Sequence, residues 1–189
     1  YSAVKEHTRI QSVTVGSGSN LAATFFLLPR DRQKAMVALY AFCREADDIA
    51  DNPGSEQDTG RRLAEWRVEI ERLFSGTPQL PISIALINPI KRFSLCKKSF
   101  LAVIQGVETD ALASVRFPNF LALEYYCDNV ACAVGRLSNQ IFGVDKVSGE
   151  PVAAALGRAL QLTNILRDLY EDASIDRLYV PMEMLSEHN

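Results

Sequence analysis

The chain has 189 residues, of which 48% are hydrophobic and 23% are charged, a balance that excludes disorder and predicts one globular domain over residues 1–189. Its formal net charge of -3 gives no whole-molecule electrostatic case for binding nucleic acid. The longest apolar run, residues 21–29, is about half of the ~20 residues that a transmembrane helix needs, and no secretory signal is recognisable. We therefore expect a cytoplasmic protein, with membrane contact limited to the periphery of the inner face.

Cysteine and histidine usage narrows the chemistry. Cys43, Cys96, Cys127 and Cys132 show no CxxC spacing, so we interpret them as reduced thiols of a cytosolic protein and not as zinc ligands. The two histidines, His7 and His188, lie near the chain ends, which argues against a mechanism built on a central histidine base.

The hydrophobic periodicity is helical almost throughout, so the sequence predicts an all-α fold. We expect a first helix over 31–51, a second over 55–74, and a third region after Pro81 that breaks at Asn88-Pro89 and resumes to about 106. A fourth helix is expected over 119–142, and a fifth over 150–173 with Pro151 in its first turn.

The expected first helix ends in an anomaly, because a nearly apolar stretch is followed by three acids. Tyr40, Arg44, Asp47, Asp48 and Asp51 recur at helical spacing and line one broad stripe. A helix C-terminus carries partial negative charge, so each acid there is unfavourable by about 0.3 to 1 kcal/mol. Either these acids form a solvated last turn, or a positive group from elsewhere compensates them.

The expected fifth helix repeats the anomaly near its own C-terminal end, with polar residues at spacings of three, four and four: Gln161, Asn164, Asp168 and Asp172. If the two helices pack around one cavity, divalent cations would relieve the repulsion between the facing acids. Oxygen ligands suit Mg²⁺ or Mn²⁺ better than zinc. Arg44 and Arg167 lie beside the two acid sets, and an arginine fork matches phosphate geometry. The pattern indicates a clamp for metal and diphosphate.

Aromatic and aliphatic residues near these acids could wall a cavity for a hydrocarbon tail, although each alone fits ordinary core packing: Phe25, Phe26, Leu39, Phe42, Tyr125 and Tyr126. An apolar pocket with a metal-bearing mouth suits ionisation of a prenyl diphosphate, since metals stabilise the leaving diphosphate and aromatic faces stabilise a carbocation. The departing diphosphate or a tyrosine could take the proton.

Two segments, ALYAFCREADDIAD and LGRALQLTNILRDLYEDASIDRLYVP, closely resemble the aspartate-rich signatures of the squalene/phytoene synthase family. The resemblance extends through SGSN, LLPRDRQKAM, WRVEIERLFSG, QGVETD and YYCDNVACAVGRLSNQIFG, and so covers nearly the whole chain. It implies an isoprenoid-synthase-type helical bundle around a central cavity.

Matched motif by motif, the resemblance implies metal ligands at Asp47, Asp51, Asn164, Asp168 and Asp172, and catalytic roles for these four aspartates and Tyr126. Asp48 falls outside the family's DxxxD spacing, and Asp110 is a further cavity candidate. Contacts to the substrate diphosphate are implied for Ser17, Gly18, Ser19, Asn20, Tyr40, Arg44, Gln161 and Arg167.

The combination of DDIADNPG, QGVETD and AVGRLSNQIFG is most similar to the bacterial branch that makes presqualene diphosphate for hopanoid synthesis. That resemblance implies Mg²⁺-dependent head-to-head condensation of two farnesyl diphosphates, without NADPH in this first half-reaction and with Mn²⁺ as a substitute metal. Downstream pathway enzymes are the expected protein partners. Synthesis of phytoene or dehydrosqualene stays open, as do a non-catalytic assembly factor of the family and a helical interaction domain with solvated acids.

Three departures qualify the match. The family commonly has Ser-Phe where this chain has Asn20-Leu21, and glycine where it has Asp176. The family also continues with further helices beyond the position of Asn189, so the chain is expected to be C-terminally truncated relative to it.

Overall fold

We describe a computed structural model of the chain that covers residues 25–51 and 54–187, and it confirms the predicted all-α class. The calls on Ser17, Gly18, Ser19, Asn20 and the Phe26 side chain lie outside the described residues. In chain order the elements are η1 (Phe25–Leu27), α3 (Arg30–Asp51), α4 (Glu56–Ser75), α5 (Pro81–Phe93), α6 (Lys97–Asp110), β1 (Val115–Arg116), α7 (Phe120–Cys127), the π-helical η2 (Asp128–Cys132), α8 (Ala133–Phe142), α9 (Lys146–Arg167), α10 (Leu169–Ser174), β2 (Arg177–Leu178) and α11 (Met182–Ser186).

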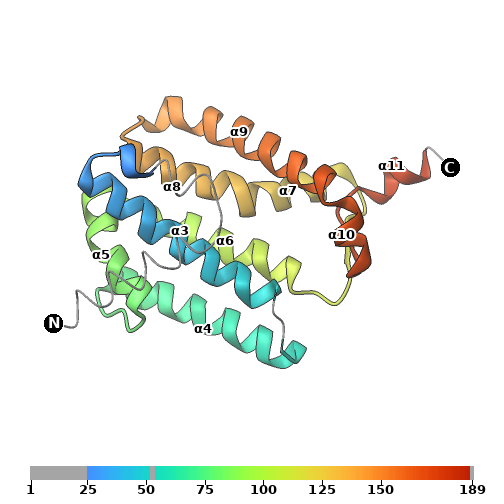
Figure 1. The fold of residues 1–189 in the computed structure, drawn as a ribbon, viewed down its shortest axis with the longest axis horizontal. Coiled ribbons are helices and arrows are strands. Elements are labelled where there is room, and N and C mark those ends of the chain that lie inside the picture. The colour runs from blue at the N-terminus through green and yellow to red at the C-terminus, as the bar shows by residue number, and fades with distance from the viewer. Residues whose placement is uncertain (1–24, 52–53, 188–189) are drawn as a thin grey trace.

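The long helices lie side by side along the longest axis of the molecule, with α9 and α8 in one layer and α3 and α6 below them (Figure 1). The main core is formed by apolar faces of α3, α4, α5, α6 and α8. Phe42 lies at its centre, with ring centroids 5.3 Å from Trp66 and 5.1 Å from Phe100. A smaller cluster around Tyr126 and Tyr179 fills the end where α7, α9 and the strands meet.

The third predicted region ends differently from the prediction. The expected break at Asn88-Pro89 is wrong, because α5 runs through Pro89 to Phe93. Pro89 is buried against the core, so tertiary packing offsets the hydrogen bond that its missing N–H removes. The break falls instead at Ser94, which closes α5 in the left-handed region with φ of 53°.

The fifth predicted helix is also shifted. It begins at Lys146, where Asp145 accepts a hydrogen bond from the backbone N–H of Ser148, and Pro151 lies inside the helix and not in its first turn. The helix bends at Asp168 and resumes as α10. The backbone N–H groups of Asp168 and Asp172 still donate to the carbonyls of Asn164 and Asp168, so the chain changes direction without losing these hydrogen bonds.

The π-helical segment η2 interrupts the fourth predicted helix between α7 and α8, where two glycines on neighbouring helices allow close approach. A Cβ at Gly157 of α9 would lie 2.9 Å from the Cα and N of Cys132, and one at Gly106 of α6 would lie 2.3 Å from Val130 Cγ1. Side chains at either position would force the helices apart.

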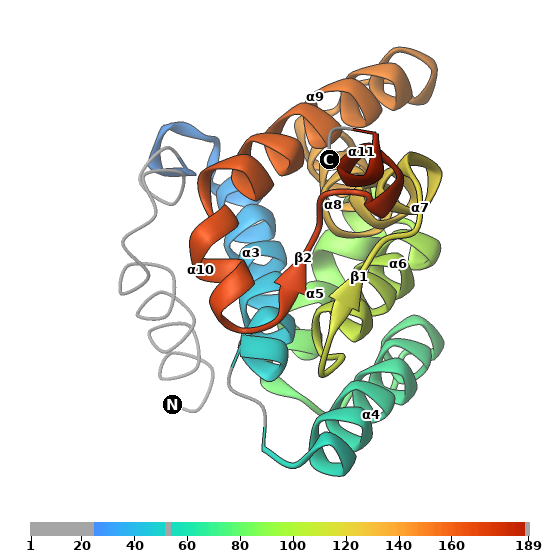
Figure 2. The same ribbon diagram turned by 90° about the vertical axis from the view of Figure 1, so that its right-hand side faces the viewer.

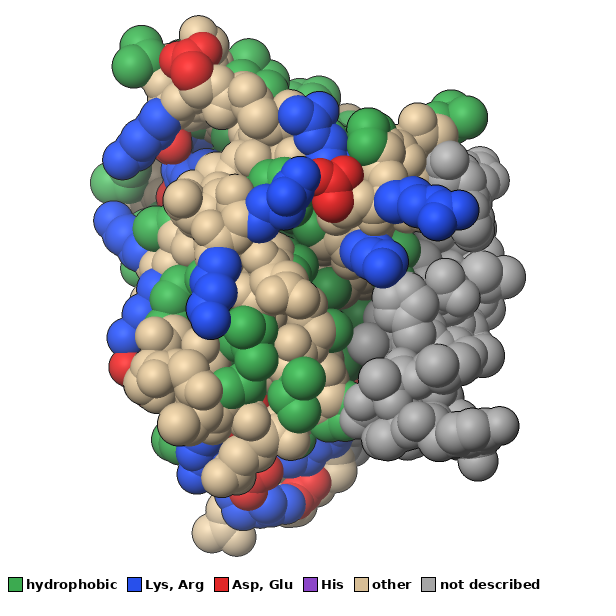
Figure 3. All heavy atoms as spheres, turned by 90° about the vertical axis from the view of Figure 1, so that its left-hand side faces the viewer, with side chains coloured by type: hydrophobic (Ala, Val, Ile, Leu, Met, Phe, Trp, Pro, Cys, Tyr) green, Lys and Arg blue, Asp and Glu red, His purple; other side chains and the backbone are tan. Residues whose placement is uncertain are grey.

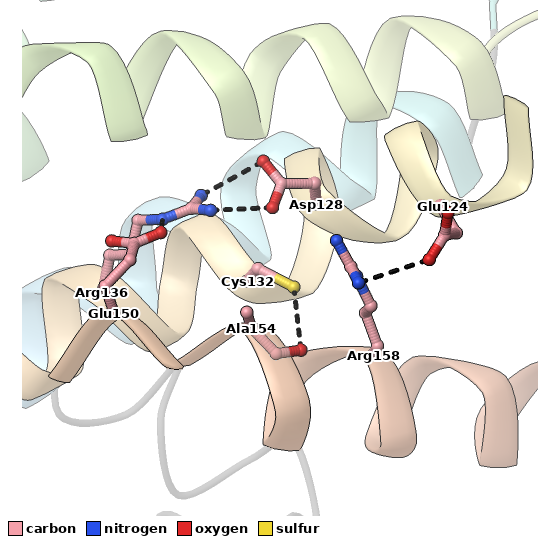
Figure 4. A network of polar contacts seen from close by, with 7 residues as sticks. All are labelled: Glu124, Asp128, Cys132, Arg136, Glu150, Ala154 and Arg158. Carbon is pink, nitrogen blue, oxygen red and sulfur yellow. Dashed lines mark hydrogen bonds and ion pairs between the residues drawn. The ribbon is translucent and has the colours of Figure 1, made fainter. Parts of the chain in front are cut away.

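A polar network fastens η2 to α8 and α9 (Figure 4). The Arg136 guanidinium donates to both carboxylate oxygens of Asp128, at 2.7 and 3.2 Å, and through Nε to Glu150 at 2.7 Å. Arg158 pairs with Glu124 at 3.2 Å, and the Cys132 thiol donates to the Ala154 carbonyl at 3.5 Å. These bonds tie α7, η2, α8 and α9 into one unit.

A short parallel pair, which the sequence did not predict, joins the segment after α6 to the segment after α10. Val115 pairs with Arg177 and Arg116 with Leu178. Within the part of the chain that the structure describes, no helix has both the length and the apolar composition needed to cross a membrane.

Candidate functional site

The two acidic clusters line one pocket, as the spacing of the acids led us to expect. The pocket has a volume of about 440 Å³. Figure 2 looks onto the end of the molecule where α3, α10 and β2, which contribute to the lining, come together. It is lined by Arg44, Asp47, Ala50, Asp51, Asp110, Tyr126, Gln161, Asn164, Ile165, Arg167, Asp168, Asp172, Arg177 and Tyr179. Residues of α3, α6, α7, α9 and α10 thus share one polar hollow.

The positive group that compensates the C-terminus of α3 is Arg177, which the sequence analysis did not assign to the site. Its side chain is only 14% exposed, and its Nη2 donates to the Ala50 carbonyl at 3.0 Å while its Nη1 lies 3.4 Å from Asp51 Oδ1. The parallel pairing of β2 with β1 brings it there. A cation at a helix C-terminus is favourable because it offsets the partial negative charge of the last carbonyls.

Within α3, the acids separate into two environments. Asp47 and Asp51 line the pocket. Asp48 is not among the lining residues and lies 2.5 Å from Nη2 of Arg44, one turn earlier. This division agrees with the DxxxD spacing, since Asp47 and Asp51 are one turn apart on the same face.

Among the carboxyl groups that line the pocket, Asp47 has the most strongly raised pKa. Solvent reaches it through the pocket mouth, but protein surrounds the carboxyl on most sides. This burial, together with the charges of Asp51 and Asp110, raises the pKa of Asp47 to about 7, although Arg44 acts in the opposite direction. Near neutral pH, the pocket therefore has an affinity for positive charge at this carboxylate.

The acids at the far side of the pocket are held differently. The Arg167 guanidinium donates two hydrogen bonds of 2.6 Å to Asp168, and this pairing keeps the pKa of that carboxyl below its usual range. Burial and the neighbouring Asp168 raise the pKa of Asp172. A bound anion that attracted Arg167 would free Asp168 for other ligands.

Asp110 lies between two tyrosine hydroxyls. Tyr179 donates to its Oδ1 at 2.6 Å and Tyr126 donates to its Oδ2 at 3.1 Å. Burial raises the pKa of Asp110 to about 6, although both hydroxyls and Arg177 favour the ionised form. Tyr179 was missed in the sequence analysis, where only its place in the RLYVP segment could have indicated it.

Several predicted residues lie outside the pocket lining. Tyr40 faces Phe25 with ring centroids 6.2 Å apart. Phe25, Leu39 and Phe42 belong to the main core, which is the ordinary core packing that the sequence analysis gave as the alternative to a cavity wall. Tyr125 is 58% exposed on the surface. Phe42 and Asp47 are five residues apart, which turns them roughly 140° away from each other on a helix.

The lining supplies the oxygen ligands that a hard divalent cation requires, from carboxylates and from the side-chain amides of Gln161 and Asn164. It also supplies guanidinium groups that can bind a phosphate. Within residues 25–51 and 54–187, no three acidic, histidine or cysteine side chains are arranged to hold one ion by themselves. Magnesium usually takes one or two carboxylates and completes its coordination with water and substrate phosphates. The donor set therefore fits Mg²⁺ that binds together with a diphosphate.

Comparison with known proteins places this geometry in a family. Residues 14–189 match the family described as squalene/phytoene synthase. The chain belongs to the squalene/phytoene synthase family. Presqualene diphosphate synthases of Rhodopseudomonas palustris and Zymomonas mobilis are similar at 44% and 45% identity over 90% and 93% of this chain, which spans only 61% and 60% of their lengths. The 15-cis-phytoene synthase of Synechococcus elongatus is 35% identical over 89% of the chain and 59% of its own length.

Solved members of the squalene/phytoene synthase family have the same fold. A squalene synthase from Alicyclobacillus acidocaldarius superposes with a TM-score of 0.86 at 26% identity, covering 98% of this chain and 70% of that one. A dehydrosqualene synthase solved with a ligand gives 0.84 at 28% identity, covering 98% and 64%. The predicted isoprenoid-synthase-type helical bundle is confirmed, and the chain spans about two thirds of the length of these solved structures.

The resemblance implied glycine at the position of Asp176, and the structure shows a backbone conformation there that suits glycine. Its φ is 62°, in the left-handed region that asparagine and aspartate tolerate better than most residues. Asp176 also gains a partner, because its carboxylate pairs with Arg116, which donates at 2.7 Å to the Asp176 carbonyl. The departure is accommodated locally and lies outside the pocket lining.

Proposed function

We propose that the full protein joins two farnesyl diphosphates head to head into presqualene diphosphate. The observation that carries this proposal is the shared pocket, which brings the acids of α3 together with Asp168, at the bend after α9, and Asp172 of α10, beside three arginines. The choice of a C15 substrate is supported by relatives named presqualene diphosphate synthase, at 41% to 45% identity, against 35% for Synechococcus elongatus phytoene synthase.

In this proposal Asp47, Asp51, Asn164, Asp168 and Asp172 hold Mg²⁺, or Mn²⁺ in its place. When bound, the metal supplies Lewis acidity that stabilises the leaving diphosphate. Arg44, Arg167 and Arg177 bind phosphate oxygens, since a guanidinium fork matches them bidentately. The side-chain amide N–H of Gln161 donates a hydrogen bond to the same diphosphate.

Tyr126 has a positioning task in this scheme. Burial and the neighbouring Asp110 raise the pKa of Tyr126, so the phenol keeps its proton and donates a hydrogen bond to Asp110. A protonated phenol is a poor base, which favours the departing diphosphate as the acceptor of the proton lost when the cyclopropane closes. NADPH is not needed for this step because no bond is reduced.

Product analysis tests the proposal. The full-length protein, incubated with farnesyl diphosphate or geranylgeranyl diphosphate and Mg²⁺, is expected to give presqualene diphosphate from the first, with or without NADPH. Exclusive formation of a C40 product would overturn the choice of substrate. Absence of metal-dependent binding of a non-hydrolysable farnesyl diphosphate analogue would instead favour a non-catalytic role.

A further inference from the structure

The end of the molecule opposite the pocket carries a concentration of positive charge. We define this basic end as residues 27–34, 91–98 and 142–148, which hold eight Lys or Arg side chains against two Asp, a formal charge of +6 in a chain of net charge -3. Every lysine among the described residues lies within it: Lys34, Lys91, Lys97, Lys98 and Lys146. The arginines, by contrast, are divided between this end, which holds Arg30, Arg32 and Arg92, and the rest of the chain.

These three segments are neighbours in space. Arg92 at the end of α5 pairs with Asp31 in the first turn of α3 at 2.5 Å. Gln140 in the last turn of α8 donates to the Ser94 carbonyl at 2.7 Å. Arg32 Nη2 lies so near Gly143 that a Cβ there would be 3.1 Å from it. The basic end is therefore one continuous surface.

Part of this charge is balanced and part is not. Arg92 is paired with Asp31, and Lys97 with Glu71 of α4 at 2.5 Å. Lys34, Lys91, Lys98 and Lys146 are exposed and form no ion pair with any other described residue. Several hydrated ammonium groups thus face the same side.

Apolar side chains project from the same surface. Leu27 is 87% exposed and Val147 is 85% exposed. Phe142 and Val144, which lie in the same segment as Val147, are also exposed. Figure 3 looks onto this end and shows Lys and Arg side chains spread among hydrophobic ones. Exposed cations interleaved with exposed aliphatic groups are typical of protein surfaces that bind anionic membranes.

We propose that the basic end docks on a membrane surface rich in anionic phospholipid headgroups. The ammonium groups lie over the phosphates, and Leu27 and Val147 enter the boundary between headgroups and acyl chains. Nucleic acid is the less suitable polyanion, because these aliphatic side chains offer nothing to phosphates and the surface carries no exposed aromatic pair for stacking bases among the described residues. In this orientation the acidic pocket faces away from the like-charged lipid.

The test is vesicle co-sedimentation of the full-length protein, comparing phosphatidylglycerol-containing vesicles with vesicles of phosphatidylcholine alone. Binding is expected only to the anionic vesicles and should weaken as salt rises. The double variant Lys34→Gln, Lys98→Gln should bind about 25-fold more weakly at low salt, since each cation near such a surface contributes about fivefold in affinity. The variant Leu27→Ser, Val147→Ser should lose the part of the binding that resists salt.

The matched control is the double variant Arg61→Gln, Arg62→Gln on α4, which removes two positive charges outside the basic end. It should bind like the unchanged protein, and product formation in detergent should be the same for all four proteins. Equal weakening by the control and the lysine variant would overturn the proposal. So would tighter binding to a mixed-sequence oligonucleotide than to anionic vesicles, or no binding to either vesicle.

Discussion

At the scale of single residues, Asp110 is the group whose partners are best defined, with one tyrosine hydroxyl on each carboxylate oxygen. The hydroxyl of Tyr179 favours the ionised form, so its removal should raise the pKa of Asp110 further above about 6. Tyr179→Phe should lower the free energy of unfolding by about 1 to 2 kcal/mol near pH 8. The loss should be smaller near pH 5, where Asp110 is protonated in both proteins.

Denaturant unfolding at the two pH values measures this difference. Tyr170→Phe is the matched control, because that ring is 95% exposed and its hydroxyl removal should change nothing. An equal effect of Tyr179→Phe at both pH values would contradict the role assigned to the Asp110 charge.

Asp47 and Asp168 should respond differently to the same substitution. Asp47→Asn removes a carboxylate that is disfavoured by burial and by its acidic neighbours, so the metal-free protein should become more stable. Asp168→Asn removes a carboxylate already paired with the exposed Arg167, so metal-free stability should stay unchanged. Both variants should lose Mg²⁺-dependent diphosphate binding, which calorimetry measures. Retained binding in both would favour solvated acids with no metal role.

At the scale of the elements, the contact between α9 and η2 depends on a missing side chain. Gly157→Ala should destabilise the protein by about 1 to 3 kcal/mol, since the new Cβ meets backbone atoms of Cys132 that have no freedom to move aside. Gly60→Ala, in an open position of α4, should instead stabilise by about 0.5 to 1 kcal/mol. Thermal unfolding of the two variants should therefore shift in opposite directions.

The helices show what periodicity could and could not predict. The ends of α3 and α4 were predicted within about two residues, because Asp31, Ser55 and Gly76 provide local start and stop signals. Pro89 misled the prediction, since its compatibility with α5 depends on burial against other helices. The bend at Asp168 and the π-helical turn of η2 depend on packing between elements and have no local signal of that kind.

At the scale of the whole molecule, the pocket couples stability to both pH and metal. The folded pKa values of Asp47, about 7, and of Asp110, about 6, lie above the ordinary carboxyl value of 3.8. The folded state therefore binds more protons than the unfolded state, and metal-free stability should fall as pH rises from about 4 through 7. Mg²⁺ requires ionised carboxylates, so its stabilising effect should grow over the same range.

Thermal unfolding with and without MgCl₂ near pH 5 and near pH 8 measures this coupling. A rise in melting temperature on adding Mg²⁺ that is equal at the two pH values would contradict it. The same experiment on Asp47→Asn should show a flatter pH dependence, because one of the two shifted carboxyls is gone.

The sequence predicted the site only as far as local pattern reaches. Asp47, Asp51, Asn164 and Asp168 were identifiable because each lies in a run with helical spacing. Arg177 was not, because its partner carbonyl on Ala50 is 127 positions away and nothing near either residue indicates the other. Tyr179 was missed for the same reason, since Asp110 is 69 positions earlier.

The long separation between Arg177 and α3 along the chain also bears on when the protein can first bind diphosphate during its synthesis. A ribosome releases α3 through α6 well before it has made β2, so the helical core can condense while the guanidinium of Arg177 does not yet exist. Until that residue has emerged, the last carbonyls of α3 and the carboxylate of Asp51 face water with no cation beside them. Nascent chains are therefore expected to bury Phe42 and its neighbours early and to acquire affinity for diphosphate only after Arg177 has emerged.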